Sequence, residues 1–194
     1  MISIENLKVE FGATPLFQGV SYIINPKDRI ALVGKNGAGK STMLKILAGL
    51  QQPTDGTVSM PKDISVCYLP QVMKLADERT VREETELAFA HISRQKEMLD
   101  RLATELAERT DYESESYHKL IERFTRENER FQIIGGANYH AEMEQTLVGL
   151  GFRREDFDRP TSEFSGGWRM RIELAKLLLQ HPDVLLLDEP TNHL

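Results

Sequence analysis

Short apolar runs in the first 70 positions either alternate with polar residues or are rich in β-branched side chains, and turn residues separate them. Both patterns are typical of β-strands. The predicted strands cover residues 2–9, 20–24, 29–33, 57–59 and 65–69. A proline-containing turn, Asn25–Asp28, separates the second strand from the third. A helical stretch then ends near Ala48, where Gly49 is placed to cap it.

The spacing of apolar residues changes after Asp77 from that of strands to that of helices. One helical face is formed by Ile92, Leu99, Leu102 and Leu106. After a polar interruption at residues 110–116, a second face is formed by Tyr117, Leu120, Ile121, Phe124 and Phe131. Two amphipathic helices joined by a polar turn predict an antiparallel hairpin, a short coiled coil.

The last part of the chain returns to a mixed pattern. The pair Gly135-Gly136 ends the hairpin, helices are predicted at 141–148 and 169–180, and an unbroken apolar run at 184–187 predicts a buried strand. We therefore predict an α/β fold in four parts: an α/β core, a charged helical arm, a second helical part, and a strand with its following loop. Their bounds are 1–76, 77–134, 135–183 and 184–194.

The composition is that of an ordinary folded protein. The chain has 194 residues, of which 40% are hydrophobic and 28% are charged, so it can bury a core. Its one cysteine, Cys67, excludes an internal disulfide and fits a reducing compartment. The apolar runs are far shorter than the roughly 20 residues that span a bilayer, and the N-terminus shows no secretory signal. We expect a cytoplasmic protein with no membrane partner.

Negative charge is concentrated in the predicted arm. Residues 77–130 hold 15 acidic and 10 basic side chains, which gives −5 of the chain's net charge of −6. This balance excludes general nucleic-acid binding and leaves only local basic patches. One basic stripe follows the second helix: Lys119, Arg123, Arg126 and Arg130. It would either lie along phosphates or be a solvated face with two ion pairs, Glu115–Lys119 and Glu122–Arg126.

Residues 34–42 match the phosphate-binding loop G-x-x-x-x-G-K-[ST] at every required position. They are Gly34, Lys35, Asn36, Gly37, Ala38, Gly39, Lys40, Ser41 and Thr42. An apolar run precedes the loop and a helix follows it, so backbone N–H groups and the helix N-terminus would face a polyphosphate. Lys40 would reach the β- and γ-phosphates, and the Ser41 hydroxyl would bind Mg²⁺. The motif predicts a triphosphate site without choosing between ATP and GTP.

Two carboxylates, Asp188 and Glu189, follow the apolar strand at 184–187. An acidic residue at the carboxyl end of a strand can hold Mg²⁺, and we assign this role to Asp188. Glu189 is then free to orient or deprotonate the attacking water as a general base. Such a pair is by itself commonly a plain strand end, but beside the phosphate loop it predicts a nucleotide hydrolase.

The segment Phe164–Trp168 resembles the signature sequence of ATP-binding-cassette (ABC) ATPases, in which Leu and Gln usually flank a Ser-Gly-Gly centre. Gln71 resembles the Q-loop glutamine, which implies a place beside the metal and the catalytic groups. Phe11 resembles the aromatic residue that stacks on adenine, which favours ATP. The resemblance implies a P-loop ATP-binding-cassette fold with an N-terminal antiparallel β subdomain, a parallel core sheet and an inserted helical-hairpin arm.

Three further features resemble one group of the superfamily, the ABC-F proteins. They are the amino-acid sequence of residues 188–194, the sequence of residues 165–171 and the charged helical arm. ABC-F proteins are soluble, carry tandem cassettes and act on ribosomes. The resemblance implies that this chain is the N-terminal cassette of such a protein, a Mg-dependent ATPase. It also implies two partners, a second cassette and the ribosome through its rRNA, a tRNA or a ribosomal protein.

The resemblance further implies a mechanism. Two cassettes would close head to tail over two ATP molecules, and Ser165, Gly166 and Gly167 would bind the nucleotide held by the opposite cassette. ATP binds the closed state better than the open state, and hydrolysis removes that difference. Ribosome binding and release would follow this cycle, as in translation factors and ribosome-protection proteins.

The sequence departs from the family pattern in two places. The chain stops at Leu194, just before the expected D-loop aspartate, and it lacks the switch-histidine segment. His193 is not the switch histidine, since it is part of the D-loop motif. The missing strand lies mid-sheet in this class, so we expect an opened sheet, and we expect residues 1–194 alone to hydrolyse ATP very slowly. At the signature, Trp168 would either contact the partner cassette or pack at the start of its helix.

Two other functions fit parts of the sequence. The ATPase subunit of an ABC transporter is one, but it would have a shorter helical insertion and an apolar docking groove near Gln71. A regulator that binds ATP without hydrolysing it is the other, and the presence of Glu189 argues against it. The charged arm and the residues after Glu189 favour the ribosome factor.

Overall fold

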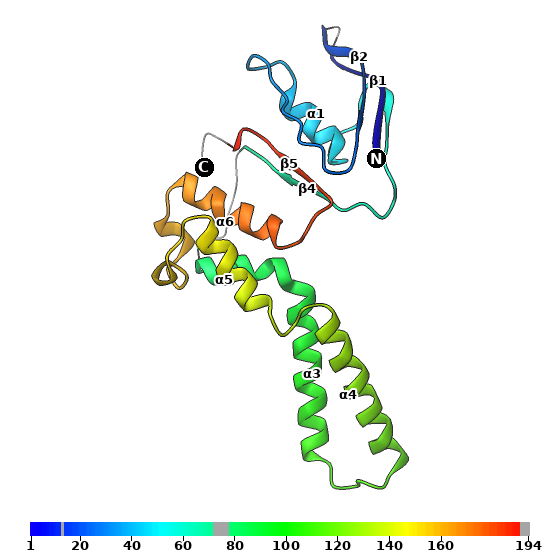
Figure 1. Ribbon diagram of the computed structural model, residues 1–194, viewed down its shortest axis with the longest axis vertical. Helices are drawn as coiled ribbons and strands as arrows, with labels where there is room; N and C mark the ends of the chain where they lie inside the picture. Colours follow the sequence, from blue (N-terminus) through cyan, green and yellow to red (C-terminus); the bar gives the residue numbers. More distant parts are fainter. Residues whose placement is uncertain (13, 72–77, 191–194) are drawn as a thin grey trace. The chain divides into compact units, whose positions relative to one another are not determined.

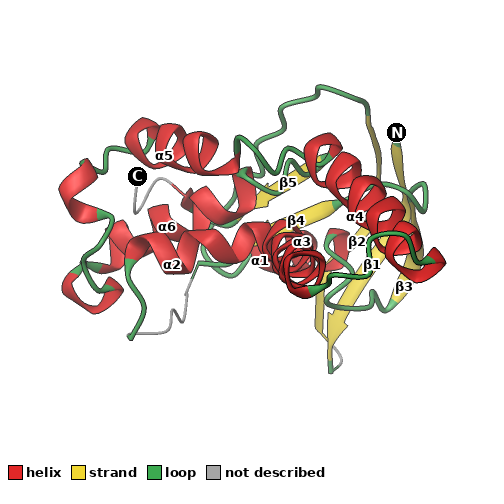
Figure 2. Ribbon diagram, turned by 90° about the horizontal axis from the view of Figure 1, so that it is seen from below, coloured by secondary structure: helices red, strands yellow, loops and turns green. Residues whose placement is uncertain are grey.

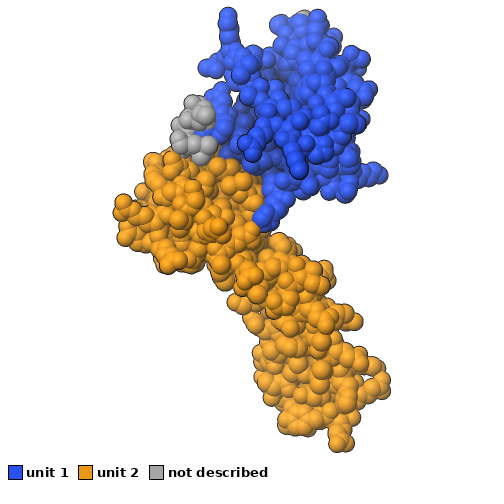
Figure 3. Space-filling view, in the orientation of Figure 1, with its two compact units in different colours: residues 1–74, 181–194 blue, residues 75–180 orange. Residues whose placement is uncertain are grey.

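The computed structural model describes residues 1–12, 14–71 and 78–190. The predicted D-loop residues 191–194 and the predicted boundary at residues 76 and 77 lie outside this part. The chain divides into two compact units, residues 1–74 with 181–194 and residues 75–180 (Figure 3). The mixed α/β architecture predicted from the sequence is confirmed, and each unit is described by itself below.

A three-stranded antiparallel sheet forms one side of the first unit. Its order is β2 (Thr14–Ile24), β1 (Ile2–Phe11) and β3 (Asp55–Ser59), drawn in yellow in Figure 2. The buried positions of β1 change phase between Ile4 and Leu7, where the register shifts and Asn6 has a φ of 49°. A bulge of this kind returns the following apolar side chains to the core face.

The second sheet of this unit is a parallel pair. Strands β4 (Val66–Leu69) and β5 (Val184–Leu187) run in register, with Val66 opposite Val184 and Leu69 opposite Leu187. Helix α1 (Lys40–Leu47) shares one core with β1 and β5, to which it contributes Met43, Leu44, Ile46 and Leu47. The predicted strands at 65–69 and 184–187 and the predicted helix end near Ala48 are confirmed, whereas β2 begins six residues before the strand predicted at 20–24.

The strand predicted at residues 29–33 is wrong. This segment has no regular secondary structure, and Ile30 and Val33 are 54% and 90% exposed. A cavity of about 800 Å³ lies between the segment and β5. β-Branched residues favour strands only where a neighbouring strand completes the hydrogen-bond ladder, and no described strand pairs with this segment.

The described part of the second unit contains helices and one isolated antiparallel bridge between Thr80 and Pro160. Helices α2 (Val81–Glu86), α5 (Tyr139–Gly149) and α6 (Gly166–Leu178) pack around one core, which includes Met143 and Ile172. Short 3-10 turns connect them at η1 (Leu87–Phe89), η2 (Arg154–Asp156) and η3 (Thr161–Glu163). Residues 81–92, within the segment predicted as the arm, therefore also belong to the core of this unit.

The predicted helical hairpin is present as α3 (Ala90–Glu108) and α4 (Glu115–Ile133), which lie side by side in Figure 1. Leu99, Leu102 and Leu120 are buried between them, and the Gln95 amide donates to Glu127. Ile121, predicted on the apolar face, is instead 42% exposed. Among the helices of the described residues, none is both long and apolar enough to cross a membrane.

Candidate functional site

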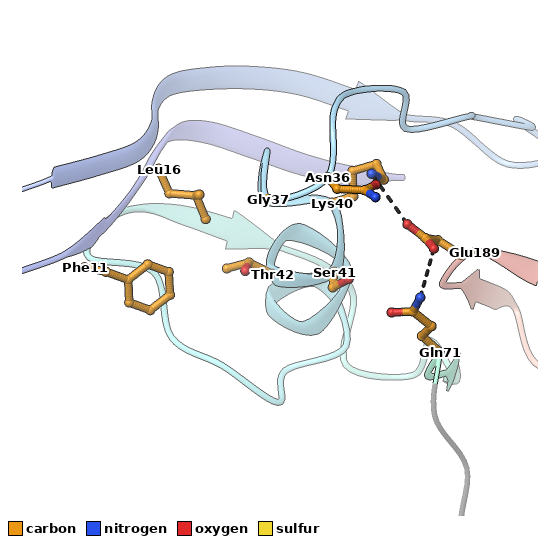
Figure 4. A pocket seen from close by; sticks show the side chains of 10 residues that line it. Phe11, Leu16, Asn36, Gly37, Lys40, Ser41, Thr42, Gln71 and Glu189 are labelled. Atoms are coloured by element: carbon orange, nitrogen blue, oxygen red, sulfur yellow. Dashed lines mark hydrogen bonds and ion pairs between the residues drawn. The ribbon is translucent and has the colours of Figure 1, made fainter.

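A pocket of about 440 Å³ opens in the first unit where α1 begins (Figure 4). Nine of its ten lining residues were predicted from the sequence, and the tenth is Leu16. The lining consists of Phe11, Leu16, Asn36, Gly37, Gly39, Lys40, Ser41, Thr42, Gln71 and Glu189. Segments that are far apart in the chain thus meet at one place.

The register of β4 and β5 explains why the last two lining residues meet. Leu69 and Leu187 pair, and the Asp188 N–H donates to the Leu69 carbonyl at 3.0 Å, so both strands end together. Gln71 and Glu189 each follow two residues later, and the Gln71 amide donates to the Glu189 carboxylate at 2.9 Å. Parallel strands place such groups at one sheet edge, where open α/β sheets bind ligands.

The phosphate-binding loop turns sharply at two glycines before α1. Gly37 and Gly39 have φ angles of +83° and +95°, a region that other residues rarely adopt. A Cβ at position 39 would lie 2.8 Å from the Leu16 side chain and 2.9 Å from that of Phe17. Glycine at position 39 therefore serves both the backbone turn and its close contact with β2. The first turn of α1 follows directly and faces the pocket.

Lys40, the first residue of α1, reaches back over the loop. Its Nζ donates to the carbonyl oxygens of Gly34 and Lys35 at 3.1 and 3.4 Å, and lies 3.6 Å from a Glu189 oxygen. The predicted residues Gly34, Lys35 and Ala38 therefore shape the loop without lining the pocket. An ammonium held in this position can bind an incoming phosphate.

Asp188 connects the phosphate-binding loop to the parallel sheet through hydrogen bonds. Its carboxylate accepts hydrogen bonds from the Ser41 hydroxyl and the Tyr68 hydroxyl, each at 3.0 Å, and Asp188 is 3% exposed. Burial, and then the nearby Asp188, raise the pKa of Tyr68 to about 12. The phenol therefore stays a donor at neutral pH and holds the Asp188 carboxylate in place.

Sequence reasoning missed Tyr68. Its contact with Asp188 follows from the parallel register of β4 and β5. Tyr68 pairs with Leu186, and side chains two residues apart lie on the same face of a strand. Tyr68 and Asp188 are therefore diagonal neighbours on that face, but a pairing register cannot be read from one strand alone.

Glu189 has a left-handed backbone conformation with a φ of 51°. For a residue other than glycine this costs roughly 1–3 kcal/mol, and such residues cluster at functional sites. The ion pair with Lys40 and the hydrogen bond from Gln71 hold the carboxylate beside the phosphate-binding loop (Figure 4).

The donors around Ser41 fit Mg²⁺. The predicted set, Ser41, Gln71 and Asp188, offers hydroxyl, amide and carboxylate oxygens, the ligand type that this ion prefers. The described residues hold no group of three or more His, Cys, Asp or Glu side chains that would enclose a metal by themselves. Mg²⁺ is usually bound through one or two carboxylates together with substrate phosphates.

Phe11 and the signature residues complete the predicted set. Phe11 ends β1 at the rim of the pocket and is 60% exposed, so its ring is accessible to a planar ligand (Figure 4). Ser165, Gly166 and Gly167 lie at the N-terminus of α6 in the second unit, and Ser165 and Gly166 are exposed. All residues that line the pocket belong to the first unit.

Comparisons with known sequences identify relatives of this chain. The ABC transporter family matches residues 17–192. ABC transporter F family member 5 of Arabidopsis thaliana is 35% identical over the whole chain. The energy-dependent translational throttle protein EttA of Escherichia coli is 37% identical over 92% of the chain. The chain spans 28% and 31% of the lengths of these two relatives. The predicted resemblance to the ABC-F group is confirmed.

Solved structures show the same fold. The ATP-binding subunit of an ABC transporter matches 98% of the chain and 66% of its own length, with a TM-score of 0.66 and 20% identity. A dimeric ATP-binding cassette in a post-hydrolysis state, bound to ADP and Pi, matches 100% of the chain and 76% of its own, with a TM-score of 0.61 and 21% identity. These structures show that the chain has the fold of an ATP-binding cassette, and the family match over residues 17–192 shows that it belongs to the ABC transporter family.

Proposed function

We propose that this chain is the ATP-binding and ATP-hydrolysing cassette of an ABC-F protein that acts on ribosomes in the cytoplasm. The observation that carries the proposal is the meeting of Lys40, Gln71 and Glu189 at one pocket, with Ser41 and Asp188 directly beside it. These side chains supply a phosphate-binding cation, oxygen ligands and a base within a few ångströms.

Each side chain has a role in hydrolysis. The Lys40 ammonium and the N–H groups of the loop bind the β- and γ-phosphates and offset their charge. Ser41, Asp188 and Gln71 would hold Mg²⁺, which neutralises developing phosphate charge when it is bound. Glu189 accepts a proton from the attacking water, and Gln71 orients its carboxylate.

The ribosome is the proposed partner of the full-length protein, together with a second cassette. The name of EttA connects one relative to translation. On α4, Lys119 pairs with Glu115 at 2.5 Å, whereas no described carboxylate pairs with Arg123, Arg126 or Arg130. Three unpaired guanidinium groups on one exposed face support contact with RNA phosphates rather than a face of ion pairs.

Glu189→Gln in the full-length protein tests the catalytic part. The amide cannot take the proton, so the ATPase rate should fall at least a hundredfold while ATP still binds, and the closed state should accumulate. Co-sedimentation with ribosomes should then increase in the presence of ATP. Recovery of the variant with membranes instead would favour the ATPase subunit of a transporter. An unchanged ATPase rate would contradict the role of Glu189 as the general base.

Charge reversal of the α4 stripe tests the RNA contact. Lys119, Arg123, Arg126 and Arg130 are changed to Glu together in the full-length protein. The slope of ribosome affinity against salt should become shallower, because fewer phosphates are neutralised. The matched control reverses four exposed charges elsewhere: Lys96, Arg101, Arg153 and Arg154. Equal slopes for both variants would remove the RNA role of the stripe.

A further inference from the structure

Two aromatic residues flank the signature turn in the sequence, Phe164 before Ser165–Gly167 and Trp168 after it. Both rings pack on Phe152, which is only 2% exposed. The ring centroids of Phe152 and Trp168 are 4.9 Å apart with planes at 68°, and those of Phe152 and Phe164 are 5.8 Å apart at 59°. Tilted and edge-on contacts at these distances are favourable. One buried ring therefore holds both ends of the turn.

Arginines cover the two outer rings. The Arg171 guanidinium lies 4.6 Å from the Trp168 ring centroid, and that of Arg159 lies 4.6 Å from the Phe164 centroid. Arg171 also donates to the carbonyl oxygen of Leu150, the C-terminal cap of α5, at 3.1 Å. Arg171 therefore links the end of α5 to the first turn of α6, with a cation–π contact on one side and a hydrogen bond on the other.

Gly151 makes room for this contact. Its φ is +94°, and a Cβ there would lie 3.1 Å from an Arg171 nitrogen and 3.6 Å from the Trp168 ring. Any larger residue would strain the backbone and push Arg171 away from the Leu150 carbonyl. The sequence from Leu150 to Phe152 is therefore fitted to the side chains on α6.

The turn itself has little support from its own side chains. Ser165 occupies the N-cap position of α6, yet among the described residues its side chain makes no capping hydrogen bond. Serine at this position ordinarily accepts a bond from the helix backbone. Its hydroxyl and the first N–H groups of α6 are therefore left for a ligand, and the conformation of the turn depends on neighbouring contacts.

We infer that Phe164, Trp168 and Phe152 form an aromatic clamp, braced by Arg171, that positions the Ser165–Gly167 turn for the nucleotide of an opposing cassette. The inference rests on the proposed function. Of the two roles considered for Trp168, packing at the start of its helix is the one that the ring contacts support. Trp168 and Arg171 are positioning residues, since they act through the turn.

The test compares two substitutions of Trp168 in the full-length protein. Trp168→Phe keeps a ring against Phe152, whereas Trp168→Gln loses the ring but restores the residue usual at this place in the family. We expect Trp168→Gln to lower kcat for ATP at least tenfold with ATP affinity within twofold. Hydrogen exchange of the Arg169 amide, which donates to the Ser165 carbonyl of the turn at 2.9 Å, should rise at least tenfold. Trp168→Phe should stay within threefold in both measurements.

A second pair of variants controls for general destabilisation. Arg171→Gln should raise exchange of the Arg169 amide as Trp168→Gln does, whereas Arg153→Gln, at an exposed arginine of the same unit, should not. Activity of Trp168→Gln equal to the wild type, or unchanged exchange of the Arg169 amide in Trp168→Gln and Arg171→Gln, would overturn the clamp. A wild-type protein that hydrolyses no ATP would contradict the proposed function, and the exchange data would still decide on the clamp.

Discussion

The two units each contain a cluster built around one lysine and acidic partners, but the clusters differ in exposure. In the first unit, the side chains of Lys40 and Glu189 are 19% and 29% exposed and 3.6 Å apart. In the second unit, Lys176 donates to Glu84 at 2.5 Å and to Glu173 at 2.8 Å, and the Glu84 side chain is 4% exposed. The first cluster faces a pocket, and the second is closed between α2 and α6.

In the buried cluster of the second unit, the cations stabilise the charged form of Glu84. Burial alone would raise the pKa of Glu84, but hydrogen bonds from Lys176 and Arg79 outweigh it, so the pKa is lowered. The Lys40 ammonium, in contrast, makes longer contacts with two carbonyl groups and one carboxylate, which phosphate oxygens can replace. The comparison indicates that similar residues serve stability where they are enclosed and ligand binding where they line a pocket.

The largest expected effect comes from Lys40→Met in the full-length protein. Loss of the phosphate-binding cation should lower kcat/KM for ATP about a thousandfold. The unfolding free energy should change by less than about 1 kcal/mol, because the ammonium lies at the rim of a pocket. Lys45→Met, an exposed lysine of the same helix, is the control and should keep its activity. A loss below tenfold would contradict the role of Lys40.

Lys176→Met should lower stability strongly and leave ATP binding intact, the reverse of Lys40→Met. It leaves the buried Glu84 without its main partner, so the unfolding free energy measured with urea should fall by about 3 kcal/mol. The affinity of the first unit for ATP should be unchanged. Adding Glu84→Gln should cost less than the sum of the single variants, because the two side chains interact. Strict additivity would show that the pair is not coupled.

The pH dependence of stability comes next in size. Because the pKa of Glu84 is lowered in the folded state, its contribution is present above the unfolded value of about 4.3 and is lost as pH falls through the folded value. The difference in unfolding free energy between wild type and Glu84→Gln should be constant near neutral pH and shrink as the pH falls below about 4. Urea titrations across this range measure it, and a constant difference would contradict the assignment.

The smallest effect is expected at an exposed pair. The side chains of Glu115 and Lys119 on α4 are 84% and 70% exposed. Lys119→Gln should lower the unfolding free energy by less than about 0.5 kcal/mol. The difference should disappear at about 1 M salt, where charges are screened within a few ångströms. An effect as large as that of Lys176→Met would break the distinction between enclosed and exposed clusters.

Much of the fold and of the pocket follows from local sequence. The loop at 34–42 and the carboxylates after residue 187 were identified because their spacing has a direct chemical meaning, and the structure places them together. The helical hairpin follows from apolar spacing over 19-residue helices, a signal that needs no knowledge of the partner.

The features that were missed depend on neighbours distant in sequence. Residues 29–33 and 184–187 have similar apolar content, but within the described ranges only the second segment has a partner strand, β4. Tyr68 reaches Asp188 because of a register between segments about 120 residues apart. Glu84 looks like one of many acidic residues of the arm until α6 brings Lys176 to it. Composition and spacing carry no information about such pairings.

The parallel pairing of β4 with β5 has a consequence for how this protein can vary. All of residues 75–180 are inserted between two strands that are hydrogen-bonded neighbours, about 4.8 Å apart. Because the strands are parallel, the insert leaves at the carboxyl end of β4 and returns at the amino end of β5, so it begins and ends at opposite ends of the pair. A grafted helical module should leave Asp188, Ser41 and Tyr68 in contact only if it also carries the chain from the carboxyl end of β4 back to the amino end of β5, and this is the requirement for building chimeric cassettes.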